Sequence, residues 1–205
     1  MKYLLRVASV LFSAVMVLAA APQTDAIRKI DFRNFVYPWD DPGGSPSSWR
    51  WTAKPTETTV RVVRGGYSFF VSDPSAPDYS SNGGPAILFM SVTYGHLLGD
   101  GREEAAVTIN YSTGGTSNWN YLYVFKLERG TPRLIARLQA GDRAYGGLFR
   151  VVIKDGLLVL DFLDPDRQQG LCCSAGYIRV RYRWEHGRFV ETGQRERGDL
   201  KPEDQ

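Results

Sequence analysis

The sequence predicts one all-β domain of antiparallel strands: a meander, a sandwich or a partly closed barrel of about ten strands. Short runs of β-branched and aromatic residues recur between Gly, Pro, Asp and Asn residues, which is the pattern of strands joined by turns. Helical periodicity is nearly absent beyond residue 26. No segment therefore predicts the helical crossover that a parallel sheet requires.

Residues 1–26 have the organisation of a secretory signal peptide. Lys2 and Arg6 precede an apolar run over residues 7–21, which is shorter than the roughly 20 apolar residues of a transmembrane helix. Small side chains allow cleavage after Ala26 or, as an alternative, after Ala20. No cysteine lies near the cut, so no lipid anchor is expected. We expect a periplasmic or secreted protein with no transmembrane segment after cleavage.

The β domain is expected over residues 27–192. The expected strands cover residues 30–37, 58–63, 67–71, 86–94, 104–111, 121–128, 134–139, 148–154, 157–163, 177–185 and 188–192. Asp155-Gly156 is the strongest hairpin signal, and a second hairpin is expected around Arg64-Gly65-Gly66. The apolar run 86–94 predicts a central strand. The charged tail, residues 193–205, predicts disorder.

The chain has two cysteines, Cys172 and Cys173, which are adjacent. Export implies an oxidising compartment, so a vicinal disulfide, two free thiols and intermolecular bridges all stay open. Glycines flank the pair, which favours a turn. Only two histidines could complete a metal site with these thiols, so we expect no metal and no cofactor.

Aromatic residues in or beside loops suggest a ligand surface. The candidates are Trp49, Trp51, Trp119 and Tyr145, together with Asp142 and Arg143 in a glycine-rich loop that could bind an anion through its backbone. Flat rings of this kind stack on sugars and ligand rings. The alternative is that the tryptophans fold back and cover the open ends of the sheet.

Arginines form a stripe on one predicted strand. Arg179, Arg181 and Arg183 alternate with apolar residues, so one face of this strand is apolar and the other is charged. The charged face could bind anions, or it could simply be solvated.

Residues 94–107 combine a turn with two acids. Asp100 and Glu104 could bind calcium only weakly, because few other oxygens are in register, and a plain turn is favoured. This segment resembles the YGDLTGDGxEEAVV signature of a family of uncharacterised secreted bacterial proteins. The resemblance continues at 114–116, 141–148, 172–174, 181–184 and 187–190, and spans roughly residues 86–192. It implies a β fold and assigns no activity. The chain departs from the signature at His96, where an acid is usual.

We expect a non-enzymatic binding or interaction module of the cell envelope, with a glycan or another envelope component as partner. The net charge of +3 gives no electrostatic case for nucleic acid. One alternative is a secreted hydrolase that uses acids such as Asp142, Asp161 and Asp164, although no nucleophile motif accompanies them. Another is a purely structural envelope protein.

Overall fold

The computed structural model describes residues 26–39, 49–52, 58–69, 84–115, 117–169 and 174–201. Its strands are β1 Val36–Pro38, β2 Arg50–Thr52, β3 Thr59–Arg61, β4 Gly66–Ser68, β5 Ala86–Gly95, β6 Glu104–Ser112, β7 Asn118–Glu128, β8 Thr131–Asp142, β9 Leu148–Lys154, β10 Leu157–Leu163, β11 Gly176–Glu185, β12 Arg188–Glu191 and β13 Glu196–Asp199. Three single-turn 3-10 helices join them: η1 Ile27–Lys29, η2 Arg143–Tyr145 and η3 Pro165–Arg167. The predicted all-β class is confirmed. No helix in the described ranges is long and apolar enough to cross a membrane.

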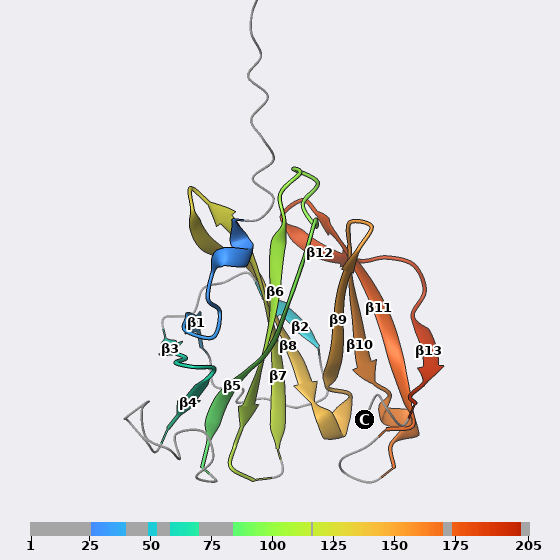
Figure 1. The fold of residues 1–205 in the computed structure, drawn as a ribbon. Helices are drawn as coiled ribbons and strands as arrows, with labels where there is room; N and C mark the ends of the chain where they lie inside the picture. The colour runs from blue at the N-terminus through green and yellow to red at the C-terminus, as the bar shows by residue number, and fades with distance from the viewer. Residues whose placement is uncertain are drawn as a thin grey trace, which may run out of the picture.

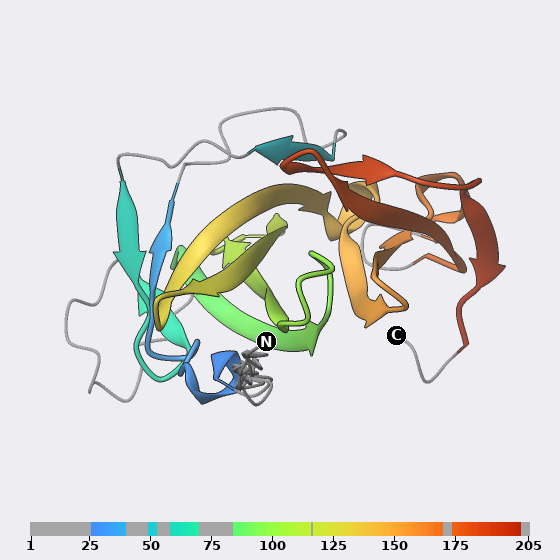
Figure 2. The same cartoon turned by 90° about the horizontal axis from the view of Figure 1, so that it is seen from above.

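The strands form three antiparallel sheets. The largest has the order β2-β8-β7-β6-β5-β4, and the second has the order β12-β11-β10-β9, with β13 also paired to β11. The third sheet contains only β1 and β3. Figure 2 shows the six-stranded sheet curving between the β1–β3 pair on one side and the β9–β12 sheet on the other. Strand order follows chain order from β4 to β8, so this part of the fold is a meander of hairpins (Figure 1).

The six-stranded sheet buries both of its faces. On β7, Tyr121, Tyr123 and Phe125 point into one core, and Leu122 and Val124 point into the other. The first core also contains residues of the N-terminal segment: Ile27, Phe32, Tyr37, Trp39, Val60 and Val62. The second core lies against the β9–β12 sheet, which contributes Leu158, Leu160, Phe162, Ile178, Val180 and Tyr182. Alternation along one strand therefore separates two apolar cores, as expected for the middle layer of three.

The two large sheets touch where β5 passes β9. The hydroxyl of Thr93 donates to the carbonyl oxygen of Val151 at 3.3 Å. Two residues further along β5, a Cβ atom built on Gly95 would lie 2.5 Å from Cγ2 of Ile153. Only glycine permits this approach of the two sheets, because any side chain at residue 95 would overlap Ile153.

The predicted hairpin around Arg64-Gly65-Gly66 is confirmed as a tight turn, closed by an antiparallel bridge between Val63 and Gly66, but its two strands do not pair further with each other. β3 pairs with β1, and β4 pairs with β5, so the turn passes the chain from one sheet to another. The predicted strand 30–37 is reduced to β1, because Asp31 accepts hydrogen bonds from the backbone of Arg33 and the side chain of Asn34 and so closes a turn. Strand β5 is second from the edge of its sheet rather than central.

Disorder of the tail 193–205 is contradicted over β13. The backbone of β13 pairs with residues 176–179 of β11. Ion pairs tie its side chains down: Arg167 donates to Asp199 at 2.6 Å, and Arg197 donates to Asp166 at 2.7 Å. The segment lacks apolar residues, so hydrophobic patterning gave no sign of it.

Candidate functional site

Trp49 lies beside the loop that follows β8, as expected if the aromatic residues of the loops form one ligand surface. Its indole ring, however, packs against the core. The ring of Trp49 stacks on Phe162 with centroids 3.7 Å apart, and its Nε1 donates to the carbonyl oxygen of Gly146 at 3.0 Å. The guanidinium of Arg195 lies 5.4 Å from the same ring. Trp49 therefore connects the loop after β8 to β10 through these two contacts.

The other two tryptophans also pack inward. Trp51 contacts Tyr182 and Phe189 with ring centroids 5.3 and 4.7 Å apart, and Trp119 is buried in the core on the opposite face of the sheet. Both tryptophans thus contact the cores, as the alternative expected, but they lie on strands β2 and β7 rather than in loops. Of the four aromatic candidates, Tyr145 is the exposed one, with 53% of its surface accessible.

Asp142 holds the loop before Tyr145 in shape. Its buried carboxylate accepts from the backbone N–H of Ala144 at 2.8 Å and from that of Asn118 at 2.5 Å. It thereby caps η2 and fastens the end of β8 to the start of β7. The side chain of Arg143 and both cysteines, Cys172 and Cys173, lie outside the described residues, so their predicted roles stay predictions.

The turn between β5 and β6 is organised by its two acids, which accept hydrogen bonds from the backbone. Glu104 is 1% exposed, and its Oε2 accepts from the backbone N–H groups of Leu97 and Leu98 at 2.7 and 3.3 Å. Asp100 accepts from the backbone of Arg102 at 3.0 Å. No group of three or more metal-ligating side chains occurs within the described part of the chain.

Two acids of the alternative hydrolase, Asp161 and Asp164, form ion pairs with arginines. Asp161 is buried on β10, where Arg179 donates to both of its oxygens at 2.7 and 2.9 Å and Arg150 lies 3.7 Å away. Asp164 accepts from the backbone of Asp166 and pairs with Arg197 at 3.3 Å. Each of these carboxylates is paired with a guanidinium, so neither arrangement resembles a paired general acid and base.

The outer face of the β9–β10–β11 sheet carries a groove of about 350 Å³. We call it the outer groove. It is lined by Val152, Lys154, Asp155, Leu157, Val159, Arg179 and Arg181. The arginines of this face were identified from the sequence, but the apolar residues beside them were missed. The pattern that could have revealed them is that every outward position of β10 except Asp161 is apolar.

The strand register explains how this groove combines apolar and cationic side chains. Across the three strands, Val159 is opposite Val152 on one side and Arg181 on the other. One step along, Leu157 is opposite Lys154 and Arg183. Leu157 and Val159 of β10 therefore lie between Val152 and Lys154 of β9 and the arginines of β11. Val152 has 38% of its surface exposed.

The cations along β11 differ in how they are balanced. Arg179 is bound to buried Asp161, and this hydrogen-bonded pairing raises the pKa of the guanidinium. Arg181 donates to Glu196 of β13 at 2.9 Å, which raises the pKa of Arg181 and lowers that of Glu196. Beyond them, Arg183 is exposed to solvent. Asp155, Asp161 and Glu196 match the three cations that line the groove, Lys154, Arg179 and Arg181, while Arg150 and Arg183 add positive charge along the same sheet face.

A second hollow of about 310 Å³ lies at another part of the surface, beside η1 and the turn after β7. Its carboxylate, Glu103, is bound by Arg28 through two hydrogen bonds of 2.6 and 2.7 Å. Arg28 also covers the ring of Tyr94 at 4.9 Å. This hollow also joins apolar side chains, Ile27 and Leu127, with the cations Arg102 and Arg129. The outer groove is the stronger candidate site because its apolar and cationic side chains lie on three adjacent strands of one sheet face.

Comparison with protein-family models, with curated proteins and with solved structures finds no match for this chain. The resemblance to the secreted bacterial family stays a prediction.

Proposed function

We propose that this protein is an exported, non-catalytic binding module, and that its outer groove takes up an anionic ligand with an apolar part. One observation carries the proposal: three aliphatic side chains on a solvent-facing sheet surface are bordered by cations from both neighbouring strands. A solvated sheet face is normally polar, and apolar patches rimmed by charge are typical of interaction sites.

The two kinds of side chain would serve different ends. Burial of Val152, Leu157 and Val159 under a ligand would stabilise the complex by removing apolar surface from water. Lys154 and Arg181 would select negative ligands and speed their association, and both effects weaken with salt.

A non-catalytic role is supported by the acids themselves. Asp142 caps a helix, Asp161 is paired with Arg179, and Asp164 shares Arg197 with Asp166, so none of them is arranged as an acid–base pair. Ligand stacking on the exposed ring of Tyr145 stays a prediction and would act at a different surface.

The test is a fluorescence-anisotropy titration with dye-labelled octapeptides rich in Glu, Gln or Lys. We expect the Glu-rich probe to bind most tightly, with affinity falling as salt is raised. Lys154→Glu should weaken its binding about tenfold, since two units of charge change beside the ligand.

Arg61→Glu is the matched control, because it makes the same charge change at an exposed position on β3, in another sheet. Equal weakening by both variants would show only a net-charge effect and would overturn the groove as the site. Equal binding of all three probes by the wild-type protein would also overturn it.

A further inference from the structure

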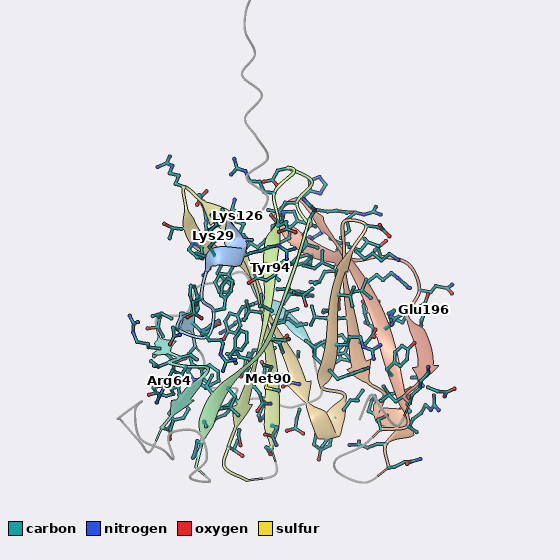
Figure 3. All side chains as sticks on the ribbon, viewed as in Figure 1. Lys29, Arg64, Met90, Tyr94, Lys126 and Glu196 are labelled. Atoms are coloured by element: carbon teal, nitrogen blue, oxygen red, sulfur yellow. The ribbon has the colours of Figure 1, made fainter. Side chains whose placement is uncertain are left out.

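The outer groove already holds a carboxylate supplied by the chain itself. Oε2 of Glu196 accepts from Arg181 at 2.9 Å, and Glu196 is the register partner of Arg179. Figure 3 labels Glu196 on β13, at the outer edge of the β11 sheet. An acidic residue of an extended segment thus neutralises a cation of the groove.

This contact is suited to exchange with an external carboxylate. The side chain of Glu196 is 54% exposed, and β13 consists of Glu196, Arg197, Gly198 and Asp199, with no apolar side chain to anchor it in a core. Exposed ion pairs are weak because water screens both partners. A competing carboxylate would therefore meet little resistance at Arg181.

The cations of β11 also have a spacing that suits one shape of ligand. Arg179, Arg181 and Arg183 occupy alternate positions, so their Cα atoms are about 7 Å apart along the strand. Alternate residues of an extended peptide repeat at the same distance. Acids at every second position could face the arginines in sequence, and apolar side chains could lie on Val159 and Leu157.

We infer that the ligand of the outer groove is an extended acidic peptide segment, and that Glu196 occupies the place of one of its carboxylates until the ligand binds. The inference rests on the proposed function and assigns the class of its ligand. Glu196 then acts as an internal competitor, which lowers the affinity for every external carboxylate that needs Arg181.

The test compares full-length wild-type protein with Glu196→Gln and Asp199→Asn. The probe is a dye-labelled octapeptide in which Glu and Val alternate, and its competitors are the unlabelled Glu–Val peptide, the Gln–Val peptide and an inorganic polyphosphate. We expect Glu196→Gln to bind the Glu–Val probe about fivefold more tightly, because the internal partner of Arg181 has lost its charge.

Asp199→Asn is the matched control, since it removes a carboxylate from the same strand at a pair with Arg167 rather than with a groove residue. It should leave the affinity unchanged. Equal tightening by both variants would mean that loosening of β13 causes the gain, and would overturn the role of Glu196.

Other outcomes separate this inference from the proposed function. If all three proteins bind the probe with one affinity, the internal competition is wrong and the groove stands. If polyphosphate displaces the probe while the unlabelled Glu–Val peptide does not, the peptide assignment is wrong. If none of the three binds the probe, the inference fails. The proposed function fails with it only if the Glu-rich probe shows no preference either.

Discussion

Glu104 shows how one buried acid can shape a turn. Its Oε2 gathers the backbone N–H groups of Leu97 and Leu98, which places Leu97 in the core beneath the turn. Its Oε1 is buried with no hydrogen-bond partner. Burial raises the pKa of Glu104 above its ordinary value, and this outweighs the two backbone donors, which lower it.

This pKa shift predicts a pH dependence. A carboxyl whose pKa is higher in the folded than in the unfolded protein stabilises the fold fully below its unfolded pKa, and that stability is lost as pH rises through the folded pKa. We expect the wild type to gain unfolding free energy relative to Glu104→Gln as pH falls from 7 toward 4. Urea denaturation across this range measures the difference.

Asp155→Asn supplies the control, because it removes an exposed carboxylate in the hairpin turn between β9 and β10. If the gap between wild type and Glu104→Gln did not widen toward acid pH, the proposed effect of burial on Glu104 would be wrong.

At the scale of elements, β10 and β11 are joined by a salt bridge on an otherwise solvent-facing surface. Asp161 and Arg179 are register partners, and the carboxylate of Asp161 is 2% exposed. A buried charge without its partner is costly, whereas replacement of both charges by apolar groups is tolerated.

Arg179→Met should therefore lower the unfolding free energy by about 2–3 kcal/mol, because Asp161 is left with only the more distant Arg150. The double variant Asp161→Leu with Arg179→Met should recover most of that loss. Denaturant titrations of the four proteins complete the cycle. Additive losses in the double variant would rule out coupling between the two side chains.

The same elements show how far patterning can predict this fold. The limits of β9 and β10 follow from alternation and from Asp155-Gly156, which both take positive φ as a tight hairpin requires. β13 escapes prediction because its pairing depends on charges far apart in the sequence, such as Arg167 and Asp199. The candidate site was half predictable: the arginines of β11 stood out, whereas Glu196 lay in a segment expected to be disordered.

At the scale of the whole molecule, the contact between the edges of the two large sheets includes one position, Gly95, where a side chain does not fit. The Cβ of an alanine at residue 95 would come within 2.9 Å of Cβ of Ile153, a branched side chain with little freedom to move. The contact between the β5 and β9 edges therefore depends on the missing side chain.

Gly95→Ala should destabilise the protein by about 2 kcal/mol through overpacking at this contact. Gly115→Ala provides the comparison, because the nearest atom to its new Cβ would be Oγ1 of Thr113 at 3.7 Å. Thermal unfolding of the two variants measures the contrast. A Gly95→Ala protein as stable as Gly115→Ala would mean that the two sheets can separate there without loss.

The six-stranded sheet is apolar on both faces, so the order in which the layers pack during folding matters. Until the N-terminal segment and the β9–β12 sheet have both packed, strands β6 to β8 expose two apolar surfaces. Each surface can associate with another unfolded chain. A newly synthesised molecule is thus least prone to aggregate when all three layers close together, and slow closure of either outer layer would be enough to start aggregation.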